Sequence, residues 1–248
     1  MDRAVIFDFD GTLVDTMGSF YDMVITNLNQ HGIIVSESTI NRLGTDLIAE
    51  FHSRSQSNGA ALILRLFWNI GRKAGLSRYR SFRFAMKCAM QSRDVYKSAP
   101  LFSDVRSTLK RLQDEGGFKL GIYTLAPRKI LLNTLETHDL IQYFSREGIV
   151  SRDDVQNLKP DPEGVFLALE GCSVPASYSV LIGDMPADIL AGAAAGLTTI
   201  GLTTGLISRE IFQQFSHPTK IFDSLEQASQ WILESYLKGN GESDDQHA

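Results

Sequence analysis

An apolar segment near the N-terminus leads directly into a group of carboxylates, and residues 3–15 read Arg3-Ala4-Val5-Ile6-Phe7-Asp8-Phe9-Asp10-Gly11-Thr12-Leu13-Val14-Asp15. Residues 3–9 are rich in β-branched and aromatic side chains, which favours a strand that is covered on both faces. Side chains two residues apart on a strand point to the same side. We therefore expect Asp8 and Asp10 to converge where this strand ends.

Two carboxylates so close together oppose each other's ionisation unless a cation relieves the repulsion. Mg²⁺ prefers oxygen ligands and commonly binds one or two carboxylates together with water and a substrate phosphate. An acidic strand end can also be purely structural, because Asp favours turns. The pair Asp8 and Asp10 therefore indicates a Mg²⁺ site, with a structural turn as the alternative.

Three later segments resemble the first strand, at residues 118–124, 179–183 and 198–202, and helical periodicity separates them. Pro127, Pro162 and Pro186 stand where helices are expected to begin, a position at which proline is tolerated. Alternating strands and helices predict an α/β fold with a parallel, Rossmann-like sheet. Ligands of such sheets bind at the carboxyl ends of the strands, so the loops there should line one crevice.

The alternation stops between the first and second strands, where only helical patterns occur, such as residues 60–70 and 82–90. This predicts an all-α cap domain at residues 17–98, inserted into an α/β core made of residues 1–16 and 99–237. The last residues, 238–248, are polar and are expected to be disordered.

Length and composition indicate a folded protein, because 248 residues with 43% hydrophobic content can bury a substantial core. No apolar stretch approaches the roughly 20 residues that span a bilayer, and the segment after Met1 does not resemble a leader, so we expect a cytoplasmic protein without a membrane span. Cys88 and Cys172 form no paired motif, which favours buried thiols over a disulfide or zinc site.

Charge is distributed unevenly along the chain, although the net charge is only −5. Residues 51–98 contain ten Lys or Arg and one acidic residue, which leaves 24 − 10 = 14 basic and 29 − 1 = 28 acidic residues elsewhere. Such a basic region can attract a phosphorylated metabolite, nucleic acid or an anionic membrane, or can simply be a solvated helical face. No Walker A loop and no G-x-G-x-x-G motif occurs, and we expect no nucleic-acid partner.

Four motifs together carry a family resemblance. The run from Asp8 to Asp15 resembles the first motif of haloacid dehalogenase (HAD) superfamily phosphatases. Thr124 at a strand end is similar to the second motif, Lys159 in Lys-Pro-Asp-Pro-Glu to the third, and Gly-Asp-Met-Pro-Ala-Asp, with Asp184 and Asp188, to the fourth. They follow one another in the family's order and span nearly the whole core.

The resemblance implies a role for each of these positions. Asp8 would attack phosphorus as the nucleophile, and Asp10 would protonate the leaving group and then activate water. The transferring phosphoryl group would be bound by Thr124, Leu125 and Lys159, and Lys159 would also neutralise charge during catalysis. Mg²⁺ would be bound by Asp8, Asp10 and Asp184, and Asp188 would orient the metal shell. Family phosphatases often have Asn where this chain has Leu125, which weakens the inference about that loop.

The function implied is a Mg²⁺-dependent phosphatase, similar to phosphoglycolate phosphatases, that hydrolyses a small phosphorylated metabolite beneath a helical cap. A phosphomutase would retain all four motifs and remains an alternative, as does a catalytically weak binding or regulatory protein with the same fold. Carbon–halogen hydrolysis needs neither a metal nor a protonated leaving group, so Asp10 and Asp184 argue against it. The sequence does not predict the oligomeric state.

Overall fold

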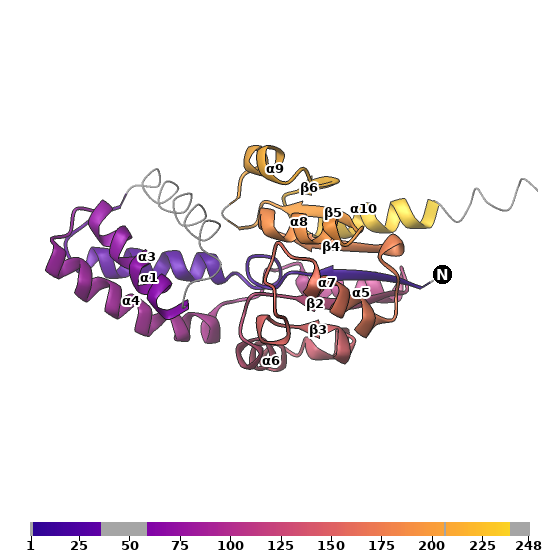
Figure 1. Ribbon diagram of the computed structural model, residues 1–248, viewed down its shortest axis with the longest axis horizontal. Coiled ribbons are helices and arrows are strands. Elements are labelled where there is room, and N and C mark those ends of the chain that lie inside the picture. Colours follow the sequence, from indigo (N-terminus) through magenta and orange to yellow (C-terminus); the bar gives the residue numbers. More distant parts are fainter. Residues whose placement is uncertain (1, 36–58, 206, 239–248) are drawn as a thin grey trace, which may run out of the picture. The chain divides into compact units, whose positions relative to one another are not determined.

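The structure is a computed structural model that describes residues 2–35, 59–205 and 207–238 (Figure 1). The chain forms two compact units, one made of Met1–Asp15 and Leu101–Ala248 and the other of Thr16–Pro100. The units meet between residues 15 and 16 and between residues 100 and 101, whereas the sequence predicts these boundaries between 16 and 17 and between 98 and 99. The polar segment expected to be disordered lies outside the described residues except for Lys238, which ends a helix.

A six-stranded sheet forms the centre of the first unit, and its order is β3-β2-β1-β4-β5-β6. Every neighbouring pair is parallel. The strands are β1 (Arg3–Phe7), β2 (Phe118–Tyr123), β3 (Ile149–Val150), β4 (Ser179–Gly183), β5 (Thr198–Leu202) and β6 (Lys220–Phe222). The predicted α/β class with a parallel sheet is therefore confirmed.

Helices pack on both faces of this sheet (Figure 1). One face is covered by α7 (Glu163–Cys172) and α8 (Pro186–Ala194), whose apolar side chains share a core cluster with Ala4, Ile6 and Leu181. Helix α5 (Val105–Asp114) packs against β2 and against α10 (Leu225–Lys238). Two further α-helices in the described part of this unit are α6 (Arg128–Thr137) and α9 (Arg209–Phe215). Covered on both sides, the central strand β1 is buried from Ala4 to Phe7, as its apolar sequence requires.

The carboxyl ends of four strands meet at one edge of the sheet. Phe7, the last residue of β1, pairs with Ile122 of β2 and Ile182 of β4, and Gly183 pairs with Gly201 of β5. The loops that follow these strands consequently begin side by side. This register positions the candidate site.

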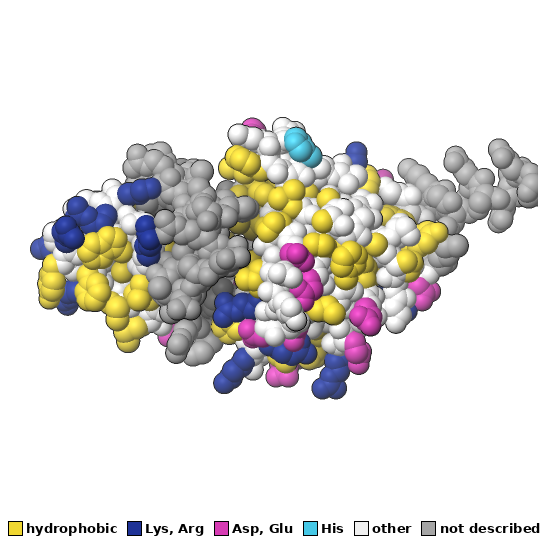
Figure 2. Space-filling view, in the orientation of Figure 1, with side chains coloured by type: hydrophobic (Ala, Val, Ile, Leu, Met, Phe, Trp, Pro, Cys, Tyr) yellow, Lys and Arg dark blue, Asp and Glu magenta, His cyan; other side chains and the backbone are white. Residues whose placement is uncertain are grey.

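The second unit is helical in its described part, with α1 (Thr16–Asn29), α3 (Gly59–Lys73) and α4 (Arg78–Ser98). The expected helices at 60–70 and 82–90 fall within α3 and α4. Phe67 and Ile70 from α3 pack with Phe84 from α4 in a separate apolar core. Hydrophobic and basic side chains gather on the surface of this unit (Figure 2). Among the described residues, no helix is both long and apolar enough to cross a membrane.

Candidate active site

Three buried carboxylates, from the segments that follow two neighbouring strands, converge at the carboxyl edge of the sheet. Asp8 directly follows β1, Asp184 follows β4, and Asp188 lies in the first turn of α8. One oxygen from each carboxylate lies within 4.8 Å of the others. The arrangement follows from the register, because β1 and β4 are hydrogen-bonded neighbours.

Lys159 joins two of these carboxylates. Its Nζ atom donates hydrogen bonds to Oδ1 of Asp8 at 2.6 Å, to Oδ1 of Asp188 at 2.7 Å and to the carbonyl oxygen of Tyr123 at 2.7 Å. The Lys159 side chain is only 2% exposed. A lysine is rarely buried to this degree unless its charge is paired, and here two carboxylates pair with it.

The electrostatics of the cluster favour an additional cation. Burial, together with the charges of Asp188 and Asp10, raises the pKa of Asp8 to about 8 even though Lys159 opposes the shift. Burial and the charges of Asp8 and Asp188 also raise the pKa of Asp184 well above its usual value. Burial disfavours the charged form of Lys159, but the two carboxylates outweigh this and raise its pKa. One ammonium group therefore does not balance the carboxylates.

The second-motif position lies at the end of the neighbouring strand β2. Thr124 is fully buried, and its Oγ1 atom accepts a hydrogen bond from the Ala126 backbone N–H at 3.0 Å. The hydroxyl proton of Thr124 is thereby left to donate to another acceptor. Leu125, the next residue, is half-buried in the loop.

Comparison with known protein families identifies the family of this chain. The family described as haloacid dehalogenase-like hydrolase matches residues 5–202, which include all the residues of the cluster. The chain belongs to this family. The resemblance inferred from the four motifs is thus confirmed, and the chain is a HAD-like hydrolase.

Two relatives of this HAD-like hydrolase have related names. The pyrophosphatase PpaX of Bacillus pumilus (strain SAFR-032) is 32% identical over 84% of this chain and 86% of the relative. A phosphoglycolate phosphatase of Salmonella typhi is 29% identical over 90% of this chain and 89% of the relative.

Solved structures share the fold of this HAD-like hydrolase. A HAD hydrolase described from Bacillus subtilis, YfnB, bound to magnesium, superposes with a TM-score of 0.69 at 19% identity and covers 94% of this chain and 99% of its own. A Thermotoga maritima protein described as a beta-phosphoglucomutase has a TM-score of 0.66 at 22% identity, with coverage of 94% and 99%. At such identities the likeness establishes the fold alone.

HAD hydrolases generally use a divalent metal, and the residues present here fit one. The Oδ1 atom of Asp184 is buried and has no hydrogen-bond partner among the described residues. A buried carboxylate oxygen is costly without a partner, and a divalent cation would supply one. Both oxygens of Asp188, in contrast, are already bound, Oδ1 by Lys159 and Oδ2 by the Met185 backbone N–H at 3.0 Å.

The carboxylate group that could hold a metal differs in one member from the expected ligand set. It contains Asp8, Asp184 and Asp188, whereas the sequence predicted Asp8, Asp10 and Asp184 as ligands. Asp10 is half-buried and lies close enough for its charge to act on both Asp8 and Asp184. It is thus near the cluster without belonging to this group of three.

Sequence reasoning missed two contacts of this site. The ring of Tyr123 lies against Lys159, with Nζ 4.7 Å from the ring centroid. Thr204, in the loop after β5, donates a hydrogen bond from Oγ1 to the carbonyl oxygen of Gly11 at 2.6 Å. The strand-end rule that identified Asp8 and Asp184 could have identified Thr204 too, since residues 198–202 were predicted to be a strand.

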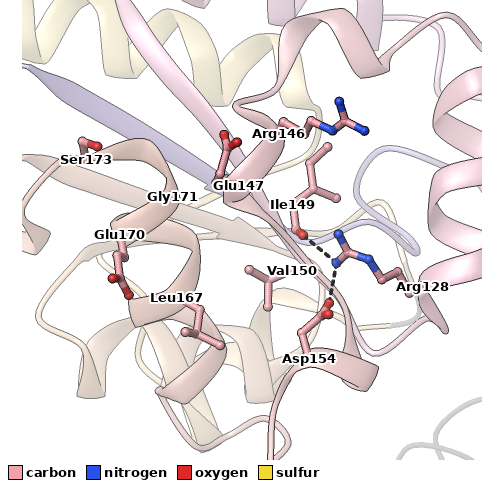
Figure 3. Close-up of a pocket in the computed structure, with 10 residues that line it drawn as sticks. All are labelled: Arg128, Arg146, Glu147, Ile149, Val150, Asp154, Leu167, Glu170, Gly171 and Ser173. Carbon is pink, nitrogen blue, oxygen red and sulfur yellow. Dashed lines mark hydrogen bonds and ion pairs between the residues drawn. The ribbon is translucent and has the colours of Figure 1, made fainter.

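A separate surface pocket of about 630 Å³ lies beside the edge strand β3 (Figure 3). Arg128 lines one side of it and donates hydrogen bonds from Nη1 to the Ile149 carbonyl oxygen at 3.2 Å and to the Asp154 carboxylate at 2.7 Å. No member of the carboxylate cluster lines this pocket. We therefore place the candidate active site at the cluster. The pocket is lined by Arg128, Arg146, Glu147, Ile149, Val150, Asp154, Leu167, Glu170, Gly171 and Ser173.

Proposed function

We propose that this HAD-like hydrolase is a Mg²⁺-dependent phosphatase that hydrolyses a small phosphate monoester through an aspartyl-phosphate on Asp8. One observation carries the proposal: a buried Lys159 is bound to Asp8, while Asp184 presents a buried carboxylate oxygen with no partner in the described part of the chain. Nucleophile, positive charge and metal ligand thus occupy one site.

In the first step, a carboxylate oxygen of Asp8 attacks phosphorus and the bond from phosphorus to the leaving oxygen breaks. Lys159 donates a hydrogen bond to Oδ1 of Asp8 and so holds the carboxylate in place for the attack. Asp10 gives its proton to the leaving alcohol. The ammonium group of Lys159 and the hydroxyl of Thr124 stabilise the negative charge of the transferring group, which is the largest contribution expected at such a site.

In the second step, water attacks the phosphorus atom of the aspartyl-phosphate. Asp10, now ionised, takes a proton from this water, the bond from phosphorus to Asp8 breaks, and inorganic phosphate leaves. Splitting the reaction in this way replaces one difficult displacement by two easier ones. Asp10 serves both steps because the same position must first lose and then gain a proton.

We propose Asp8, Asp10 and Asp184 as the residues that hold Mg²⁺, with Asp188 orienting Lys159 and the metal shell. When bound, the cation supplies charge neutralisation for the phosphate and for the nucleophile. Asp188 suits an orienting role because its oxygens are bound to Lys159 and to the Met185 N–H.

The names of two relatives support a substrate class. One is named a pyrophosphatase and another a phosphoglycolate phosphatase, and both names describe small phosphorylated molecules. We propose a substrate of that size for this chain. We also propose a cytoplasmic location, which the two free, buried thiols of Cys88 and Cys172 support because reducing compartments keep thiols unpaired.

The test is a Mg²⁺-dependent activity screen against phosphoglycolate, pyrophosphate, sugar phosphates and nucleotides. The wild-type protein should release phosphate from at least one compound, and Asp8→Asn should abolish release. Asp114→Asn is the matched control, because Asp114 is exposed on α5 and its carboxylate pairs with the exposed side chain of Lys110. Sugar phosphates that are isomerised instead of hydrolysed would indicate a mutase.

The covalent step needs its own measurement. Acid-quenched enzyme should carry a phosphoryl group on the peptide that contains Asp8, as detected by mass spectrometry. In water enriched in heavy oxygen, the label should enter the released phosphate and not the Asp8 side chain, because water attacks phosphorus. Label in Asp8 would show attack at the carboxyl carbon and would contradict the proposed route.

A further inference from the structure

The loop after β5 contacts the catalytic motif at two points. Thr204 donates its hydroxyl to the carbonyl oxygen of Gly11 at 2.6 Å, across 193 residues of sequence. The next residue, Gly205, lies against the carboxylate of Asp184, and a Cβ atom at position 205 would stand 2.0 Å from Asp184 Oδ2. No side chain other than hydrogen fits there unless Asp184 moves.

Gly11 encloses the same oxygen from another direction. A Cβ atom at position 11 would lie 2.2 Å from Asp184 Oδ2. Gly11 also has a φ of +81°, a conformation that favours glycine over other residues. The Oδ2 atom of Asp184 therefore lies between two glycine backbones, and Thr204 ties one of these backbones to the loop that carries the other.

This enclosure determines the orientation of a short side chain. Asp184 is 2% exposed, and its carboxylate can turn only by rotation about the two side-chain bonds. With Oδ2 held against Gly11 and Gly205, Oδ1 is the oxygen without a partner in the described residues. The loop after β5 thus decides which oxygen of Asp184 is available.

We propose that Thr204 and Gly205 are positioning residues of the active site. They hold the Asp184 carboxylate and the Gly11 turn in the orientation that binds the divalent cation. The inference rests on the proposed function, because it assigns these residues to the proposed metal site. Groups that orient metal ligands typically affect metal affinity by about 10- to 100-fold when they are removed.

The decisive measurement is Mg²⁺ affinity, determined by calorimetry on the full chain after treatment with a chelator. Gly205→Ala should weaken Mg²⁺ binding about 10- to 100-fold, because the added methyl group displaces the Asp184 carboxylate. Thr204→Val keeps the shape of the side chain and removes one hydrogen bond, so we expect about a five-fold loss. Thr204→Ser, which keeps the hydroxyl, should restore most of the affinity.

Thr203→Val is the matched control from the same loop. The Thr203 hydroxyl bonds to Asp223 at 2.7 Å and to the Phe222 carbonyl at 3.4 Å, on the side of β6. This variant loses a hydroxyl of the same kind and should bind Mg²⁺ as the wild type does. Thermal unfolding of every variant in the presence of a chelator shows whether the fold is intact. If Gly205→Ala does not fold, the Mg²⁺ affinity of Thr204→Val tests the proposal.

The outcomes separate this inference from the proposed function. Wild-type protein that binds no Mg²⁺ would overturn both. Wild-type binding with unchanged affinity in Gly205→Ala or, if that variant does not fold, in Thr204→Val would overturn the positioning role alone. Equal losses in Thr203→Val and Thr204→Val would also overturn it, because the effect would then belong to general loop stability.

Discussion

Individual residues of the site are held by contacts that have opposing energetic effects. The Tyr123 ring lies 4.7 Å from Lys159 Nζ and packs against Gly164, where a Cβ atom would come within 2.2 Å of the ring. The Tyr123 hydroxyl is buried and has no hydrogen-bond partner among the described residues. The ring therefore stabilises the ammonium group, while the hydroxyl destabilises the fold.

Substitutions at Tyr123 should separate these two effects. Tyr123→Phe keeps the ring and removes the unpaired hydroxyl, so we expect unchanged activity and a gain of about 1 kcal/mol in the free energy of unfolding. Tyr123→Leu removes the ring and should lower kcat about five-fold, given a cation–π energy of about 1 kcal/mol. Denaturant unfolding and steady-state kinetics measure both. A large loss of activity in the Phe variant would assign the hydroxyl a role that its contacts do not suggest.

The raised pKa of Asp8 predicts how the stability of the metal-free protein depends on pH. The folded state holds a proton up to a pKa of about 8, whereas the unfolded value is 3.8. Binding of this proton therefore stabilises the folded state, and its contribution to the free energy of unfolding is fully present below about pH 4 and is lost as the pH rises through about 8. With a chelator present at pH 8 to 9, Asp8→Asn removes the buried negative charge and should raise the free energy of unfolding by about 1 kcal/mol. The gain should be smaller at pH 5, and melting temperatures measured at both pH values check this.

The control for this pH series is Asp114→Asn at the exposed pair on α5. With a chelator present, the stability of this variant should depend on pH as that of the wild type does across the whole pH range. Added Mg²⁺ should stabilise the wild type and the control and have much less effect on Asp8→Asn. Parallel curves for the wild type and Asp8→Asn would contradict the raised pKa.

Among the elements, α7 depends on a close approach to the backbone of a neighbouring turn. The 3-10 turn Arg146–Gly148 passes beside Gly171 of α7, and a Cβ atom at position 171 would lie 2.2 Å from the Glu147 backbone. Backbone atoms cannot rotate away as a side chain can. The helix therefore has to be displaced if this glycine is replaced.

Gly171→Ala should destabilise the fold by about 2 kcal/mol, although alanine is the better helix former. The neighbouring substitution Glu170→Ala, at an exposed position of the same helix, should change stability by less than about 0.5 kcal/mol. Urea unfolding compares the two variants directly. Equal changes in stability for the two variants would contradict the importance of the close contact between position 171 and the turn.

In the whole molecule, each of the two units contains one buried thiol. Cys88 lies in the helical core of the second unit, and burial raises its pKa to about 12. Cys172 lies in the core of the α/β unit, and burial raises its pKa as well. A thiol must become exposed and ionised before it reacts, so both report on opening of the structure around them.

We expect both thiols to react slowly with an alkylating agent in the native protein and rapidly in denaturant. Mg²⁺ at about 100 times its dissociation constant should slow the labelling of Cys172 by up to about 100-fold, because the proposed ligands belong to the same unit. Peptide mass spectrometry resolves the two sites, and Cys88 serves as the internal reference. Labelling of Cys172 at the rate of an exposed thiol would contradict its burial.

The sequence by itself predicted the family through the resemblance of its four motifs. It also predicted the α/β class and four of the six strands of the described sheet, because apolar runs between helical segments identify buried parallel strands. It did not predict β3 or β6, which are two and three residues long and are formed only by pairing with a neighbour. The periodicity of apolar residues along the sequence indicates which residues are buried. Strands of two or three residues are too short to show such a period.

Only the tertiary structure shows which of the candidate residues are in contact with one another. The sequence named Lys159, Asp8 and Asp188, but only the tertiary structure shows that the Lys159 ammonium group binds both carboxylates. The same holds for Gly205, which the sequence did not single out and which lies against Asp184 because β5 pairs with β4. A motif encodes the chemistry of its own side chains, whereas contacts between distant segments depend on how the strands pair and pack.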